Sequence, residues 1–137
     1  MRFNGMWVRA LLVTAGVTLI AVGATAPSPV AHFTAAQASS GRNTYMAQCS
    51  YCHGANLAGV FAPALAGSGS NVPYQSPGAI YGYTSVYMPV GNAGGLRQED
   101  YVDITAFLMQ QNGRIPSSTP LTLTAINDDQ SPMTPSK

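Results

Sequence analysis

Cys49-Ser50-Tyr51-Cys52-His53 is the stretch from which the rest of this sequence is best interpreted. Two thiols frame it, and an imidazole follows the second thiol directly. They are the only two cysteines in the chain. This pattern is the attachment signature of a c-type haem, in which both thiols form thioethers and the histidine binds the iron. The motif therefore predicts one haem c, held covalently by Cys49 and Cys52, with His53 as an iron ligand.

Two other interpretations of a Cys-x-x-Cys pair compete with haem. A thioredoxin-like redox pair belongs in a βαβ context, and the sequence shows no such pattern. A zinc site needs four ligands, and the only histidine besides His53 is His32. The histidine immediately after Cys52, together with an export signal at the N-terminus, favours haem.

The N-terminal segment has the pattern of an export signal. Arg2 and Arg9 come before or at the start of an uncharged apolar run, Ala10–Ala26. Small-residue cleavage sites occur at Ala24-Thr25-Ala26 and at Ala36-Gln37-Ala38, so the position of a cut stays open. A retained membrane anchor is the alternative, because the run is near the lower limit of about 17 residues for a spanning helix. Both interpretations predict that the folded part lies in the periplasm.

Composition divides the chain into three parts. Residues 1–38 are predicted to be a signal peptide or N-terminal anchor with a linker, and residues 39–113 a haem domain. Residues 114–137 are rich in Pro, Ser and Thr without any period, which predicts an extended or disordered tail. A domain this small buries only about 60% of its unfolded surface. The covalently bound haem would therefore supply the additional stabilisation that domains of this size usually take from a metal or disulfides.

The haem domain is predicted to be all-α, with three to four helices around one covalently bound haem and long loops between them. Ser39-Ser40 can cap the first helix. Ser76-Pro77 predicts the start of a short helix that stops before Met88-Pro89. The clearest helical period comes last and begins with acidic residues. The helices are expected at about 40–50, 77–87 and 97–111, with a loop at 54–74.

The second iron ligand is encoded less directly. The candidates are an open site or one of Met46, Met88, Met109, Met133 and His32. Met46 is too close to Cys49 to reach the opposite face of a haem, Met109 has a packing position, and Met133 lies in the tail. Met88 directly follows the predicted end of a helix and is itself followed by a proline. It is the ligand that we predict. A thioether opposite an imidazole raises the reduction potential of the haem and occupies the remaining coordination position of the iron. Both effects suit an electron carrier and not an enzyme.

The other ring nitrogen of His53 should be held by a hydrogen-bond acceptor, usually a carbonyl. The backbone oxygen of Pro63 is the candidate. The alternative is that Pro63 only shapes the loop.

Over about residues 40–112 the sequence resembles the class I monohaem cytochromes c. The resemblance rests on the haem motif, Gly41-x-x-x-Tyr45, Ala62-Pro63-Ala64-Leu65, Met88-Pro89, and Ile104, Phe107 and Leu108 on the last helix. It implies the small cytochrome c fold, in which the first and last helices cross with Gly41 against Phe107 and Tyr45 beside them. It also implies that the loop proline, here Pro63, carries the carbonyl that binds the proximal histidine.

The segment Tyr87–Leu96 and the helix after it are similar to small cytochromes associated with PQQ-dependent quinoprotein dehydrogenases. The resemblances imply a periplasmic one-electron carrier that contacts a dehydrogenase donor and an oxidase or other acceptor transiently, at the haem edge. The alternatives are a dedicated haem subunit of a membrane-associated oxidoreductase complex and, more weakly, an open-site ligand-binding haem protein. With six Lys and Arg against five Asp and Glu, the sequence has no basic patch for nucleic acid.

Overall fold

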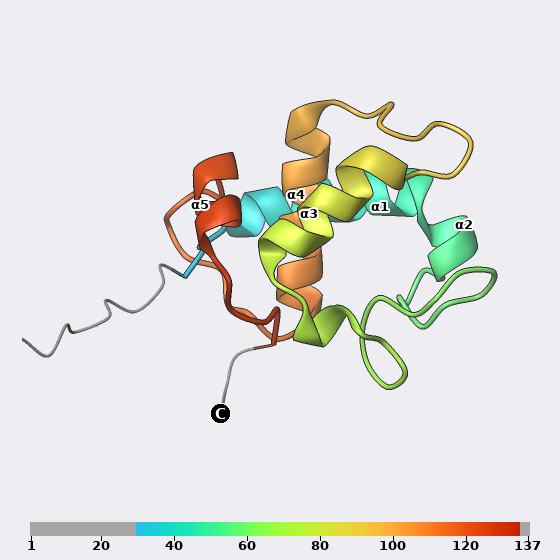
Figure 1. Cartoon of the computed structure of the whole chain (residues 1–137), viewed down its shortest axis with the longest axis horizontal. Coiled ribbons are helices and arrows are strands. Elements are labelled where there is room, and N and C mark those ends of the chain that lie inside the picture. Colours follow the sequence, from blue (N-terminus) through green and yellow to red (C-terminus); the bar gives the residue numbers. More distant parts are fainter. Residues whose placement is uncertain (1–29, 135–137) are drawn as a thin grey trace, which may run out of the picture.

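A computed structural model describes residues 30–134 of the chain, and this part is helical without strands (Figure 1). The elements are α1 (Ala35–Gln48), α2 (Ser50–His53), the 3-10 helix η1 (Val72–Tyr74), α3 (Pro77–Tyr87), α4 (Gln98–Gln111) and α5 (Leu123–Asp128). The all-α prediction is confirmed. With the short helices α2 and α5, the described residues contain more helices than the three to four expected. The predicted export signal lies outside the described residues. Within them, no helix has the length and apolar character needed to cross a membrane.

The crossing of α1 and α4 forms the centre of the core (Figure 1). Gly41 allows the two backbones to approach, because a Cβ atom at this position would overlap the carbonyl group of Asp103. One turn further along α1, the buried ring of Tyr45 packs against Phe107 with ring centroids 5.3 Å apart. The helices therefore cross at the predicted glycine and aromatics. The atoms that approach Gly41 most closely belong to the backbone of α4 at Asp103 and Ile104.

Helix α1 begins earlier than the sequence led us to expect. Its cap is Thr34, whose hydroxyl accepts from the Gln37 backbone N–H at 3.1 Å, while the Gln37 side chain accepts from the Thr34 backbone N–H at 3.2 Å. This reciprocal arrangement is a capping box, and it outcompetes Ser39-Ser40 as a start signal. The boundary between linker and haem domain at residues 38 and 39 is therefore wrong. Phe33, in front of the cap, is already buried in the core.

Helices α3 and α4 lie within a residue of their predicted bounds. Ser76 caps α3 by accepting from the backbone N–H of Ala79 at 3.3 Å, and Pro77 takes the first helical position. Arg97 precedes α4 without a capping hydroxyl. Instead, the Asp100 carboxylate accepts from its backbone N–H at 3.2 Å and from its guanidinium. These hydrogen bonds from Arg97 lower the pKa of Asp100.

The predicted extended or disordered tail at 114–137 is wrong for the residues that the structure describes. Leu121, Ile126 and Met133 are buried in the core, and α5 packs against α3. Each such side chain contributes roughly 1.5–3 kcal/mol when fully buried, which offsets the ordering of a Pro- and Ser-rich segment. The chain then lies along the N-terminal segment, and we call residues 31–34 and 114–134 together the terminal clasp.

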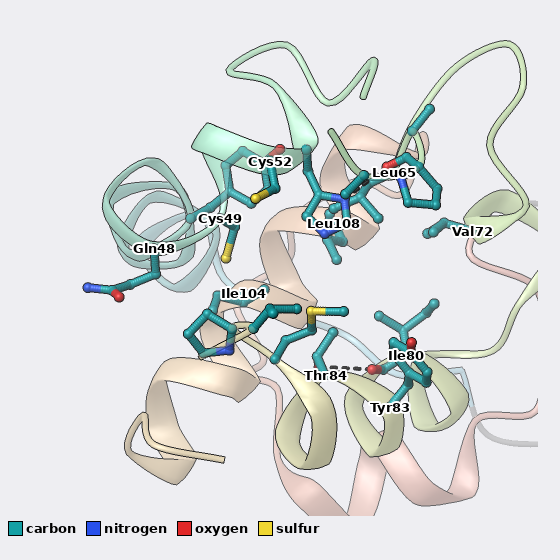
Figure 2. Close-up of a pocket in the computed structure, with 18 of the residues that line it drawn as sticks. Gln48, Cys49, Cys52, Leu65, Val72, Ile80, Tyr83, Thr84, Ile104 and Leu108 are labelled. Atoms are coloured by element: carbon teal, nitrogen blue, oxygen red, sulfur yellow. Dashed lines mark hydrogen bonds between the residues drawn. The ribbon is translucent and has the colours of Figure 1, made fainter. Parts of the chain in front are cut away.

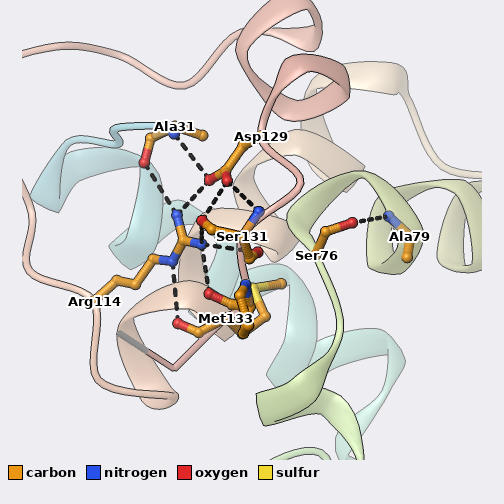
Figure 3. A network of polar contacts seen from close by, with 8 residues as sticks. Ala31, Ser76, Ala79, Arg114, Asp129, Ser131 and Met133 are labelled. Atoms are coloured by element: carbon orange, nitrogen blue, oxygen red, sulfur yellow. Dashed lines mark hydrogen bonds and ion pairs between the residues drawn. The ribbon is translucent and has the colours of Figure 1, made fainter. Parts of the chain in front are cut away.

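A buried ion pair holds the terminal clasp together (Figure 3). The Arg114 guanidinium lies 2.5 Å from the Asp129 carboxylate, which also accepts from the backbone N–H groups of Ala31 and Ser131 at 2.9 and 2.8 Å. Burial by itself raises the pKa of Asp129, but the hydrogen bonds from Arg114, Ser131 and Ala31 outweigh it and leave the pKa lowered. Asp129 is therefore charged at neutral pH, and the pair joins the two ends of the folded part.

Candidate haem site

A cavity of about 860 Å³ opens between the haem motif, the loop after α2, and helices α3 and α4 (Figure 2). Its size is within the range of cofactor pockets, and its lining is mostly apolar. The five residues predicted for the site all line it: Cys49, Cys52, His53, Pro63 and Met88. The fold thus brings together residues from helix α2, from the C-terminal ends of α1 and α3, and from a loop around one space.

The two thiols lie together on one side of the cavity (Figure 2). Cys49 caps the C-terminus of α1, and the single turn of α2 carries Cys52 and His53. Both thiols are free and half-buried. Burial, with a smaller contribution from Cys52, raises the pKa of the Cys49 thiol to about 11. Two thiols at the edge of an apolar cavity fit the role of thioether anchors.

The ring of His53 is oriented by the loop. Its Nδ1 lies 2.8 Å from the carbonyl oxygen of Pro63. With Nδ1–H donated to that carbonyl, Nε2 is left as the nitrogen that can bind a metal. Pro63 is thus in the position that the sequence predicted for the acceptor, ten residues along the chain from the imidazole.

The loop that carries Pro63 is fixed by backbone bonds to the haem motif. The carbonyl oxygen of Cys52 accepts from the backbone N–H groups of residues 60–62, each at 3.0 Å. On the core side, the Tyr45 hydroxyl donates to the carbonyl oxygen of Gly54 at 2.6 Å. Burial raises the pKa of Tyr45 to about 12, so this hydroxyl remains a donor at neutral pH. The long loop therefore serves to support the imidazole.

Met88 lines the cavity from the C-terminal end of α3, whose residues Ile80 and Thr84 lie across the cavity from the thiols (Figure 2). The other candidates lie elsewhere in the molecule. Met46 and His32 are exposed, whereas Met109 and Met133 are buried in the core. Of the five side chains considered, Met88 is the one that lines the cavity.

The donor set and the wall fit a c-type haem. The cavity offers two thiols, an imidazole and a thioether, and apolar side chains from α3 and α4 complete its lining. Within residues 30–134 no group of three or more His, Cys, Asp or Glu could hold a metal ion. The zinc alternative therefore finds no ligand set in this part of the chain.

One residue of the cavity was not predicted from the sequence as a site residue. Tyr101 is buried near the start of α4 and lines the cavity. Its hydroxyl also donates to the backbone carbonyl of Met88 at 2.7 Å. No sequence signal pairs a helical tyrosine with a carbonyl thirteen residues earlier, so this contact required the structure.

Comparisons with known proteins agree with the site. Among solved structures, the chain is similar to one in the crystal structure of the sulfane dehydrogenase SoxCD from Paracoccus pantotrophus, with 26% sequence identity and a TM-score of 0.61. The match covers 69% of this chain and 53% of that chain, so this chain spans about half the length of its structural relative. A comparison with curated protein sequences gives no match.

The family model described as cytochrome c oxidase, cbb3-type, subunit III matches residues 36–108. This range is more than half of the chain, and it contains the haem motif, Pro63, Met88 and most of α4. The cavity, the paired thiols and the oriented imidazole supply what a covalently bound haem requires. The chain therefore belongs to this family of cytochrome c domains, and it is a class I monohaem cytochrome c with a covalently attached c-type haem and its iron.

Proposed function

We propose that this protein is a periplasmic one-electron carrier whose iron is held by His53 and Met88. When bound, the haem supplies a one-electron Fe(III)/Fe(II) couple. Cys49 and Cys52 would tether it, and Pro63 would hold the imidazole. The observation that carries the proposal is that a thioether and an oriented imidazole line the same apolar cavity. With both groups on the iron, substrate and oxygen would be excluded from it, which favours electron transfer over catalysis.

The surface around the cavity supports contact with redox partners. From Asn43 to Leu96 the chain contains no Asp, Glu, Lys or Arg. At the cavity wall, Phe61 packs against Tyr51 with ring centroids 5.4 Å apart, although the two residues are 73% and 78% exposed. Aromatic side chains are enriched where proteins meet. We therefore place the transient partner contact at this pair, next to Cys52, with a dehydrogenase as donor and an oxidase or other acceptor.

A dedicated haem subunit of an oxidoreductase complex is the second candidate. The family model is named after an oxidase subunit, and the structural relative is a dehydrogenase. A second exposed aromatic pair, Tyr83 and Tyr87, lies on α3 with ring centroids 5.1 Å apart. A permanent partner would cover more apolar surface than a transient one. The link to quinoprotein dehydrogenases stays a prediction, because neither comparison names one.

The first experiment replaces Met88 with Ala and records the absorption and the reduction potential. We expect the six-coordinate low-spin spectrum of the natural protein to change to that of an open iron site, and the potential to fall, because the thioether favours Fe(II). The matched control is Met46→Ala, since Met46 is exposed and does not line the cavity. An unchanged spectrum and potential in Met88→Ala would show that Met88 is not a ligand. Binding of carbon monoxide by the reduced natural protein at neutral pH would support the open-site alternative instead.

A second experiment separates a diffusing carrier from a fixed subunit. Membranes that contain the protein are solubilised in a mild detergent, and the protein is purified in that same detergent. A carrier is expected to elute alone, whereas a subunit elutes with a dehydrogenase or an oxidase.

A further inference from the structure

We infer that Tyr101 is a positioning residue for Met88, and that its hydroxyl sets how readily Met88 leaves the iron. The inference rests on the proposed ligation by Met88. It concerns the segment Met88–Leu96, which connects α3 to α4 and which we call the ligand segment.

The Tyr101 hydroxyl joins the two ends of the ligand segment. It donates to the carbonyl oxygen of Met88 at 2.7 Å, and it accepts from the backbone N–H of Leu96 at 3.3 Å. A phenol has one hydrogen to donate and lone pairs to accept, so a single group makes both bonds. The first and last residues of the segment are thereby attached to the same point on α4.

That point is rigid because Tyr101 belongs to the core. The residue is only 3% exposed and lies in the first turns of α4, the helix that crosses α1. The start of α4 is fixed in turn by the Asp100 carboxylate on the backbone of Arg97. The hydroxyl therefore stays in place when the segment moves.

Few other hydrogen bonds attach the segment to the rest of the fold. Residues 90–95 are exposed, and Val90 is 82% exposed. The Met88 carbonyl also accepts from the backbone N–H of Gly94 at 3.2 Å, but that bond is internal to the segment and moves with it. The Met88 backbone N–H donates to the carbonyl of Thr84 at 3.1 Å, which fixes the near end on α3. The Leu96 side chain packs against the core, and the Tyr101 bonds are the hydrogen bonds that tie the carbonyl side of Met88 and the backbone of Leu96 to α4.

Opening the segment so that Met88 leaves the iron would break the bond from the Tyr101 hydroxyl to the Met88 carbonyl. Without the hydroxyl, the open form should become about fivefold to tenfold more populated, the effect of one net hydrogen bond. An added ligand such as imidazole binds the iron only when Met88 has left. Its apparent affinity therefore rises by the same factor as the open population.

The experiment compares the natural holoprotein with Tyr101→Phe, which keeps the ring and removes the hydroxyl. The oxidised proteins are titrated with imidazole and followed by absorption, and backbone hydrogen exchange is measured at Leu96 and Gly94. We expect imidazole to bind Tyr101→Phe about fivefold to tenfold more tightly, and exchange at Leu96 to be faster. Tyr74→Phe is the matched control, because Tyr74 is 80% exposed and does not line the cavity. It should behave as the natural protein does.

A general loss of stability is separated from loss of positioning by Asp129→Asn. This variant weakens the buried pair with Arg114 in the terminal clasp, and neither residue lines the cavity. It should lower the midpoint of unfolding and leave the imidazole affinity unchanged. Unchanged imidazole affinity and unchanged Leu96 exchange in Tyr101→Phe would overturn the inference. If Met88→Ala also binds imidazole no more tightly than the natural protein, the ligation by Met88 has failed instead.

Discussion

In the terminal clasp an arginine and an aspartate are buried as an ion pair, whereas the stretch Asn43–Leu96, which forms most of the cavity, contains no Asp, Glu, Lys or Arg. The clasp is held by charge-assisted bonds around Asp129. The cavity region is held by neutral bonds to backbone carbonyls, from Tyr45 to Gly54 and from His53 to Pro63. Two regions of one small domain thus use opposite means of stabilisation.

The difference follows from what a redox centre tolerates. At low dielectric two unit charges a few ångströms apart interact by several kcal/mol, so a carboxylate in the cavity would strongly shift the potential of an iron there. Neutral hydroxyl and amide groups can orient ligands without such an effect. Neither Arg114 nor Asp129 lines the cavity, and the charges that close the fold are therefore kept apart from the iron site.

Removing one charge of the clasp should have the largest effect. Asp129→Ala leaves the Arg114 guanidinium buried without its counter-charge, and breaking a buried pair in this way costs about 3–5 kcal/mol. Denaturant unfolding should show this loss, whereas the haem absorption of the folded protein stays that of the natural protein. Asp128→Ala is the control, because this neighbouring carboxylate is exposed at the end of α5. A loss below about 1 kcal/mol would mean that the clasp is closed by its apolar contacts and not by the pair.

Acid should weaken the same pair, with a smaller effect. Because the folded state lowers the pKa of Asp129, this group adds stability above the ordinary aspartate pKa of about 3.9. The added stability disappears as the pH falls through the lowered value in the folded protein. Unfolding of the natural protein and of Asp129→Asn is measured from neutral pH downward, and their difference should shrink below about pH 4. Asp103, whose pKa is raised by burial, is present in both proteins and cancels. A difference that is constant with pH would mean that Asp129 stabilises the fold by the shape of its side chain and not by its charge.

The cavity could be predicted from the sequence because its signals are local. The haem motif is contiguous, and Ser76-Pro77 and Met88-Pro89 mark the two ends of one helix by their own backbone preferences. The place of Met88 at the cavity wall therefore follows from where the helix must stop. The contact between Tyr101 and Met88 was beyond the sequence because it depends on how α4 lies across the end of α3.

The clasp could not be predicted for the opposite reason. Leu121, Ile126 and Met133 have neither helical nor strand spacing, and their burial depends on a surface that exists only after the core has formed. The pairing of Arg114 with Asp129 is equally a product of the folded chain. One local signal was available, since Thr34-x-x-Gln37 has the capping-box pattern. It would have moved the start of the domain in front of residue 35.

The smallest expected effect concerns salt and sharpens the comparison at the cavity. Electrostatically steered association slows steeply as ionic strength rises, but a partner contact on the uncharged stretch Asn43–Leu96 has no charge to screen. Between about 0.01 and about 0.5 M salt the Debye length falls from about 30 Å to well below 10 Å. Over this range the rate of electron exchange with a purified partner should change by less than about twofold. Val90→Lys places a charge on an exposed position of the cavity wall and should make the rate salt-dependent. A steep dependence in the natural protein would move the partner contact to the charged surface around Arg97 and Glu99, away from the aromatic pair at Tyr51 and Phe61.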